Sequence, residues 1–229
     1  ARQNSLKTKT QLTNPDFKMI LKVISTGSQG NAYILENDNE ALLIECGVNI
    51  SDIKKAIDFN VSKIAGCIIT HEHLDHSRSI LEVMNSGIDV YATTGTLNER
   101  GVIGPRAKSI KALQEFHVGS FRIMPFDVKH DCAEPVGFLI NHPECGKTLF
   151  LTDSIYCPYT FDGLNNIIIE ANYCKDIVDA RYGDEAKTHF LRNRVLKSHF
   201  SIANCKDMLA ANDLSAVNNI VLIHLSDRN

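Results

Sequence analysis

The 229-residue chain has no tryptophan, and aromatic residues make up only 7% of it. It has no apolar stretch long enough to span a bilayer, so we expect no contact with a membrane. No long block of one charge stands out either, because 24 Lys and Arg residues stand against 27 Asp and Glu residues. Proteins that bind long nucleic acids usually carry a basic face. The charge balance does not exclude nucleic acid, but it favours a small anionic substrate.

The chain also lacks any Cys-x-x-Cys pair, although it contains seven cysteines. An odd number without that spacing is typical of reduced thiols in a cytoplasmic protein, and argues against a disulfide framework or a thiolate zinc site. No signal-peptide pattern opens the sequence. Residues 1–16 are polar and non-periodic, so we expect a flexible N-terminal arm or an added edge segment there.

Short apolar segments separated by turn residues are typical of an α/β or α+β fold. We expect strands at 19–25, 32–35, 41–45, 65–70, 90–92, 121–128, 136–140, 149–152, 167–170 and 219–224. We expect helices at 51–59, capped by Ser51, and at 80–84, 188–196 and 202–211. Such clusters in both halves of the chain predict two packed sheets with helices outside. No linker divides them, so residues 17–229 are expected to form a single domain.

The run His71-Glu72-His73-Leu74-Asp75-His76 directly follows the strand expected at 65–70. Alternation along an extended chain places His71 and His73 on the same side, with Asp75 and His76 just beyond and able to face a second point. Imidazole and carboxylate groups are good zinc ligands, and they are costly to bury without partners. The run therefore predicts a metal site, and a solvated polar loop is the alternative.

Three further candidates each follow an apolar strand: His130, Asp153 and His224. Any one of them alone could be a surface residue that closes a strand. Carboxyl ends of strands are where α/β-type proteins gather their sites, so together they predict the ligands that a second metal ion requires. His199 lies between two expected helices, where Ser201 is expected to cap the second one.

These residues resemble the metallo-β-lactamase superfamily, whose motif His-x-His-x-Asp-His stands here at residues 71–76. The resemblance runs from Lys22 to the C-terminus and implies a four-layer αββα sandwich with two metal ions at one edge of the sheets. It implies two zinc ions per chain, with Mn²⁺ as an alternative because such sites accept several divalent ions. One ion would bind His71, His73 and His130, the other Asp75, His76 and His224, and Asp153 would bridge them.

Within the superfamily, four segments resemble small phosphodiesterases and nucleases. They are the Gly/Ser turn at 25–31 and the segments at 169–172, 198–201 and 224–229. The set is also similar to the anti-Pycsar phosphodiesterases of phages, which cleave cyclic mononucleotides. The chain departs from the pattern at Glu45, where the family usually has Asp, and at Phe200, where it usually has Leu. The first departure concerns a residue that supports the metal ligands.

The resemblance implies a binuclear zinc phosphodiesterase that hydrolyses 3′,5′-cyclic mononucleotides in counter-defence against cyclic nucleotide signalling. It also implies a homodimer, in the host cytoplasm if the chain is phage-encoded. Asp75 would orient the attacking water, and His199 would protonate the leaving oxygen while Glu170 orients its ring. Glu170 and His199 as a purely structural ion pair are the alternative. Further candidates, for substrate contact, are Ser28, Asn31 and Asn172.

Three other functions stay open. A 5′-to-3′ exonuclease on DNA or RNA ends would have a basic groove with stacking aromatic residues, and Arg192, Arg194 and Lys197 are candidates for its charge. A thioester or lactone hydrolase of the same fold would not need the pair Glu170 and His199. A purely structural metal site would be closed by four protein ligands, whereas seven candidates for two ions leave room for water.

Overall fold

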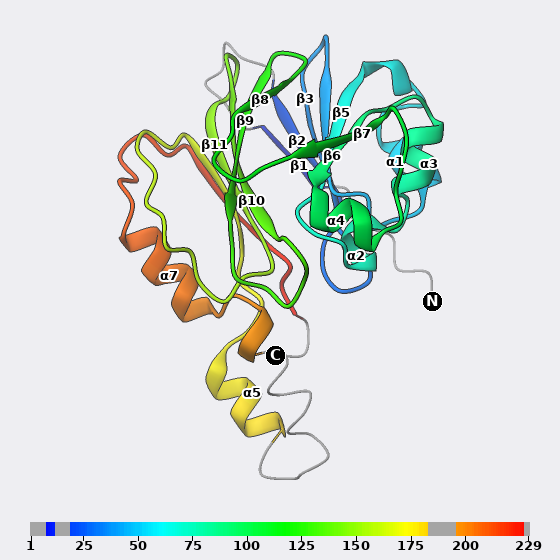
Figure 1. The fold of residues 1–229 in the computed structure, drawn as a ribbon. Coiled ribbons are helices and arrows are strands. Elements are labelled where there is room, and N and C mark those ends of the chain that lie inside the picture. The colour runs from blue at the N-terminus through cyan, green and yellow to red at the C-terminus, as the bar shows by residue number, and fades with distance from the viewer. Residues whose placement is uncertain (1–7, 12–18, 183–195, 227–229) are drawn as a thin grey trace, which may run out of the picture.

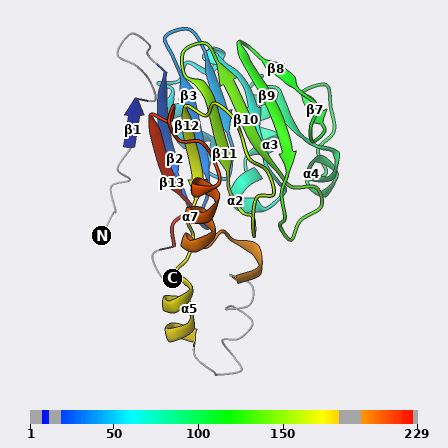
Figure 2. The same ribbon diagram turned by 90° about the vertical axis from the view of Figure 1, so that its left-hand side faces the viewer.

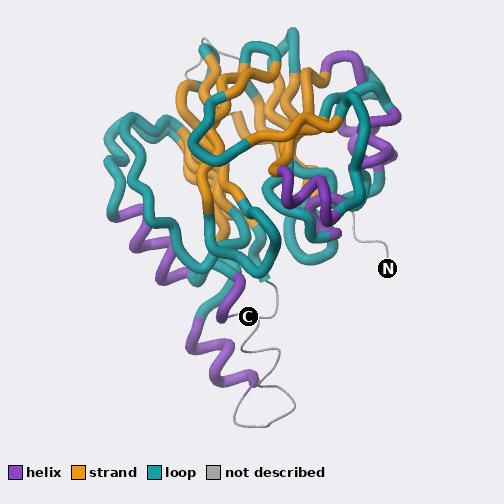
Figure 3. The backbone as a smooth tube through the Cα atoms, in the orientation of Figure 1, coloured by secondary structure: helices purple, strands orange, loops and turns teal. Residues whose placement is uncertain are grey.

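Two β-sheets face each other in the computed structural model, which describes residues 8–11, 19–182 and 196–226 (Figures 1 and 3). The strands of the first sheet follow the chain order: β1 (Thr8–Gln11), β2 (Ile20–Ser25), β3 (Ala32–Glu36), β4 (Ala41–Ile44), β5 (Ile64–Ile68), β6 (Val90–Thr93) and β7 (Ala107–Ile110). The second sheet has the order β13 (Asn219–Ile223), β12 (Asn166–Glu170), β11 (Gly146–Leu151), β10 (Val136–His142), β9 (Phe121–Asp127) and β8 (Phe116–Val118).

The helices lie mainly on the outer faces of the sheets (Figures 1 and 2). They are α1 (Ile50–Ala56), α2 (Leu74–Ser77), α3 (Ile80–Asn85), α4 (Thr94–Glu99), α5 (Lys175–Tyr182) and α7 (Ile202–Ala210), with a 3₁₀ turn at Val61–Lys63. Among the described residues, none of these helices is long and apolar enough to cross a membrane.

Three apolar clusters hold the layers together. The first lies between the sheets, where the rings of Tyr33 and Phe150 meet edge to face with their centroids 5.4 Å apart. The second joins the first sheet to α1 and α3 and includes Ile53 and Val83. The third joins the second sheet to α7 and includes Met208. Helix, sheet, sheet and helix thus form four layers, which confirms the predicted αββα sandwich.

Most of the expected elements are confirmed, with some corrections at their ends. The cap predicted at Ser51 is wrong, because α1 begins one residue earlier with Asn49 at the N-cap position and no side-chain cap bond. Ser201 does cap α7, and its hydroxyl accepts a hydrogen bond from the backbone N–H of Asn204 at 3.0 Å. The helix expected at 188–196 lies almost wholly outside the described residues.

The strands and α-helices that were not predicted from the sequence are β1, β7, β8, α2, α4 and α5. Strand β1 pairs antiparallel with β2. The division into an arm at 1–16 and one domain at 17–229 stays a prediction.

Strand direction brings the candidate ligands to one edge of the sandwich. Strands β11, β12 and β13 are parallel, and β9 runs the same way because both β9 and β11 are antiparallel to β10. Four carboxyl ends of the second sheet therefore lie at one edge. The loop that follows β5 reaches the same place from the first sheet, as the contacts of its histidines show.

Candidate metal centre

The first group of candidate ligands consists of His71, His73 and His130. The Nδ1 atom of His73 lies 3.1 Å from Nε2 of His71 and 3.1 Å from Nε2 of His130. The three rings come from the loop after β5 and the loop after β9, so the two sheets contribute jointly. Their ligand atoms lie within 4.8 Å of one another. Two ligands of one zinc ion lie about 4.4 Å apart at most, because each is about 2.2 Å from the ion, so this spacing is close to what one ion requires.

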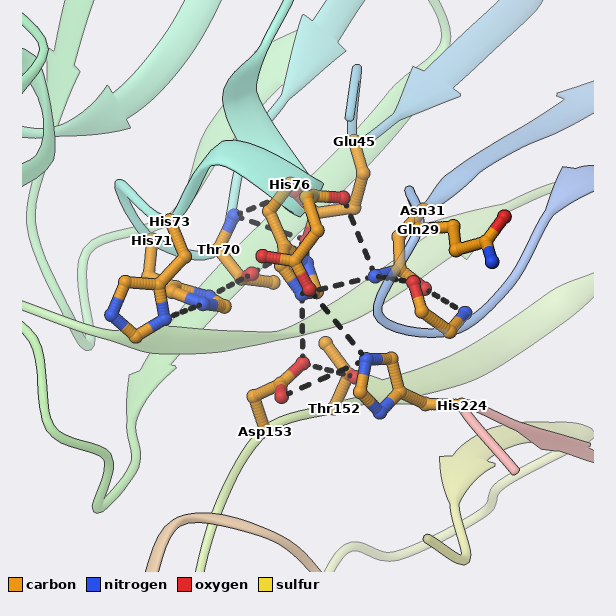
Figure 4. A network of polar contacts seen from close by, with 12 residues as sticks. Gln29, Asn31, Glu45, Thr70, His71, His73, His76, Thr152, Asp153 and His224 are labelled. Atoms are coloured by element: carbon orange, nitrogen blue, oxygen red, sulfur yellow. Dashed lines mark hydrogen bonds and ion pairs between the residues drawn. The ribbon is translucent and has the colours of Figure 1, made fainter. Parts of the chain in front are cut away.

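The second group is Asp75, His76 and His224, whose ligand atoms also lie within 4.8 Å of one another. Asp153 lies beside both groups, with Oδ2 2.9 Å from Nε2 of His76 and with further close groupings that include His71 and His224 (Figure 4). The structure thus brings together all seven residues that the resemblance assigns to two ions, with Asp153 in the middle. That they bind two zinc ions stays a proposal.

The chemistry of these side chains fits a divalent cation. His224 is 2% exposed, and within the described part of the chain its Nε2 atom has no hydrogen-bond partner. Carboxylate oxygens of Asp75 and Asp153 lie 3.9 Å from that atom, which is too far for a hydrogen bond. A buried ring nitrogen without a partner is costly, whereas a bound cation would use its lone pair.

The pKa shifts of His71 and Asp153 also favour the binding of a cation. Burial and the neighbouring His76 hold the pKa of His71 well below its ordinary value, so its ring is neutral, as a metal ligand must be. Burial alone would raise the pKa of Asp153, but the imidazoles of His224 and His76 hold it well below the ordinary range. The centre therefore presents an ionised carboxylate among imidazole rings.

Asn31 braces the second group from the turn between β2 and β3. Its backbone N–H donates to the carbonyl oxygen of Asp75 at 2.6 Å, and its side-chain Nδ2 lies 3.1 Å from Nε2 of His76. The Oδ1 atom of Asn31 in turn accepts hydrogen bonds from the N–H of Gly27 and the hydroxyl of Tyr33. The side chain predicted to contact substrate is thus fully buried and engaged with the protein.

Glu45 and Thr70 contact two of the candidate histidine ligands, His71 and His76. The Thr70 hydroxyl donates to Oε1 of Glu45 at 2.5 Å and lies 2.9 Å from Nδ1 of His71. The same Glu45 oxygen lies 3.5 Å from Nδ1 of His76. Groups of this kind fix the tautomer and orientation of a ligand ring. Glu45 was singled out from the sequence but Thr70 was not, although its hydroxyl directly before the first histidine was the available signal.

Glu170, the last residue of β12, contacts both His199 and His224. Its Oε1 lies 2.8 Å from Nδ1 of His199 and 3.0 Å from Nδ1 of His224. The Nδ1 atom of His199 also lies 3.0 Å from Oδ1 of Asp153. Burial opposes a charge on His199, but the hydrogen bonds to Asp153 and Glu170 raise its pKa to about 10. The predicted pair therefore lies directly against the candidate ligands.

Three residues here have left-handed backbones that residues with a side chain rarely adopt. Glu45 has φ 63°, Asp153 has φ 46° and His224 has φ 52°. Each directly follows, or follows within two positions, the end of a strand. Strain of this kind costs about 1–3 kcal/mol per residue and clusters at functional sites. The sequence carries no signal for it, because none of the three is glycine.

Of the other predicted site residues, one contacts a candidate ligand, and the rest are exposed or lie outside the described residues. Ser28 is exposed in the turn between β2 and β3. Asn172 is buried, with Nδ2 2.9 Å from Nδ1 of His224 and donating to its carbonyl oxygen at 2.9 Å. Lys197 is exposed, two residues before His199. Arg192 and Arg194 lie outside the described residues.

Comparison with known proteins finds a matching family and a similar nuclease. Residues 25–94 match the family described as the metallo-beta-lactamase superfamily. The chain is 27% identical over 219 residues to exodeoxyribonuclease YycJ of Bacillus anthracis, which covers 89% of this chain and 81% of the relative.

Two solved structures share the fold. The metallo-beta-lactamase fold protein YhfI from Bacillus subtilis has a TM-score of 0.66 at 15% identity and covers 92% of this chain and 88% of that one. Human tRNase Z, short form, has a TM-score of 0.62 at 18% identity and covers 91% of this chain and 93% of that one. The chain therefore has the metallo-β-lactamase fold, and its similarity to this superfamily supports a metal-dependent hydrolase.

Gly47 lies where its backbone packs closely against the backbone of Asp75 and His76. A methyl group on Gly47 would lie 1.6 Å from the carbonyl oxygen of Asp75, a clash that only a backbone shift relieves. The residue before it, Cys46, donates its N–H to the carbonyl oxygen of His76 at 2.8 Å. We expect Gly47→Ala to displace the loop and to lose most of the bound metal, as measured by elemental analysis of the purified protein.

The control is Gly163→Ala. A methyl group at Gly163 would meet nothing closer than the end of the Lys147 side chain at 3.9 Å. This variant should keep its metal, because Gly163 lies in open space, although its φ of 65° strains an alanine there. A Gly47→Ala protein with the metal content of the unmodified chain would contradict the close packing described here.

Proposed function

We propose that this chain is a two-zinc phosphodiesterase that cleaves phosphodiester bonds of DNA from an end. The observation that carries the proposal is the position of His199, held by Glu170 at 2.8 Å and by Asp153 at 3.0 Å beside the candidate ligands. Cleavage of a phosphodiester expels a poorly stabilised alkoxide, so a positioned proton donor accelerates it. A thioester or lactone hydrolase of the same fold has less need of that pair.

The seven clustered residues supply the metal centre of this proposal. His71, His73 and His130 would hold one ion; the other would be held by Asp75, His76 and His224, with Asp153 between them. Bound divalent ions would supply a water of lowered pKa and neutralise charge on the phosphoryl oxygens. Mn²⁺ is the alternative to zinc.

Side chains of the protein would carry out the proton transfers. Asp75 is partly exposed, and its carboxylate can orient the attacking water and accept its proton. His199 gives the proton on Nε2 to the leaving oxygen, while Nδ1 stays hydrogen-bonded to Glu170. Glu170 is fully buried and therefore fixes the imidazole in one orientation. The same carboxylate also contacts His224, so it couples the acid to the metal centre.

The surface near the centre supports a nucleotide substrate. Three exposed apolar or aromatic residues each lie within three positions of a candidate ligand along the chain. They are Leu74 (58% exposed), Tyr156 (43%) and Leu225 (53%). The Nζ atom of Lys129 lies 5.6 Å from the centroid of the Tyr156 ring. Apolar faces together with a cation suit a base and its phosphate.

The similarity to an exodeoxyribonuclease over 89% of the chain favours DNA as the substrate. Cyclic mononucleotides are the second candidate, because the four segments at 25–31, 169–172, 198–201 and 224–229 resemble anti-Pycsar phosphodiesterases. A homodimer belongs to that second proposal.

A substrate panel tests the proposal. The zinc-loaded protein should release mononucleotides from a 5′-phosphorylated oligodeoxynucleotide, with little turnover of a 3′,5′-cyclic mononucleotide or an acyl thioester, as measured by chromatography of the products. Preferred hydrolysis of the cyclic nucleotide would replace DNA by the second candidate. Preferred hydrolysis of the thioester would overturn the phosphodiesterase proposal itself.

The proton donor generates a separate prediction. His199→Ala should slow cleavage of the oligodeoxynucleotide by roughly 10²- to 10⁴-fold, the usual contribution of general acid catalysis. It should slow a p-nitrophenyl diester much less, because p-nitrophenolate leaves without protonation. The control is His117→Ala, at an exposed histidine of β8, which should change neither rate. Equal losses on both substrates with unchanged metal content would assign His199 a different role.

A further inference from the structure

A cavity of about 410 Å³ is lined in part by the turn between β2 and β3. This volume falls in the range of about 300–1,000 Å³ that is typical of ligand sites. Ile24 and Val48 form apolar wall, and the charged or amide side chains of the lining are Gln29, Asn49, Asp52, Lys55 and Arg78. No candidate metal ligand lines the cavity, so it is separate from the metal centre.

The cavity nevertheless adjoins the metal centre through two short stretches of chain. Gln29 stands two residues before Asn31, which contacts His76. Arg78 stands two residues after His76 itself. Two residues of chain span at most about 7 Å, so the backbone of Gln29 lies within about 7 Å of that of Asn31, and the backbone of Arg78 within about 7 Å of that of His76. Figure 4 shows the side chain of Gln29 pointing away from the histidines, so the turn separates the two places.

The charge of the cavity comes mainly from Arg78. The Nζ atom of Lys55 lies 3.3 Å from a carboxylate oxygen of Asp52, which neutralises much of its charge. Within the described residues, Arg78 forms no ion pair, and the hydrogen bond from its Nη2 reaches only the carbonyl oxygen of Gln29 at 3.4 Å. Its guanidinium is exposed and retains donors in a planar fork that matches a phosphate group.

We propose that this cavity binds a backbone phosphate of a DNA strand that flanks the bond being cleaved, through the guanidinium of Arg78. The inference rests on the proposed function and narrows its substrate to a strand with more than one phosphate. The strand passes from the metal centre over the turn that contains Gln29. A cyclic mononucleotide has a single phosphate and cannot occupy both places.

Steady-state kinetics on two substrates test this inference. One is a single-stranded decadeoxynucleotide, and the other is thymidine 5′-(p-nitrophenyl phosphate), which has a single phosphodiester. Arg78→Ala should raise KM for the decamer roughly tenfold, the usual effect of losing one hydrogen bond to a charged group. It should leave KM and kcat for the p-nitrophenyl ester unchanged. The slope of log(1/KM) against log salt for the decamer should become less steep by about 0.7, the value for one phosphate of a single strand.

Two further variants complete the experiment. Arg78→Lys retains the charge and should recover part of the decamer affinity. Arg122→Ala removes an equal charge on the second sheet, at the start of β9 and thus at the opposite end of that strand from His130, and should change neither substrate. Two results would overturn the phosphate site and leave the proposed function standing, provided that the unmodified protein cleaves the decamer. Arg78→Ala either leaves KM and the salt slope for the decamer unchanged, or affects both substrates equally. If the unmodified protein cleaves the ester but not the decamer, the proposed function is overturned with it.

Discussion

Burial of ionisable side chains at the joint edge of the two sheets is the constraint on which the rest of this structure depends. His71, His76 and His224 are all at most 2% exposed, and they lie against the buried carboxylates of Asp153 and Glu170. Hydrogen bonds satisfy only some of these buried polar atoms, because the Nε2 atom of His224 has no hydrogen-bond partner among the described residues. Bound cations satisfy lone pairs that the protein leaves without donors. The remainder of the fold serves to bring these groups together.

That assembly depends on backbone conformations that ordinary packing does not favour. Asp153 and His224 turn into the centre with positive φ, and the turn at Glu45 does the same behind His76. Packing between the sheets fixes the strands from which these residues emerge, so the strain is local and its energy is supplied by the core. Gly47 permits the closest contact between two of the loops. A small displacement of any one segment would therefore separate ligands that come from opposite sheets.

Much of this arrangement could be predicted from sequence. The strands were visible because apolar runs ended at turn residues, and the candidate ligands were visible because polar residues followed those runs. Neither signal depends on tertiary contacts. The bracing role of Asn31 could not be predicted, because the contact with His76 joins residues 45 positions apart. Strand β7 was not predicted because its alternation is short, and the cap predicted at Ser51 was wrong because the helix already begins at Ile50. The cavity beside Arg78 likewise exists only after folding.

Crystals of the zinc-loaded protein, measured with X-rays on both sides of the zinc absorption edge, would locate the bound ions. We expect two anomalous peaks per chain, one beside His71, His73 and His130 and the other beside Asp75, His76 and His224, with the carboxylate of Asp153 near both. A single peak, or peaks that contact other side chains, would contradict this expectation.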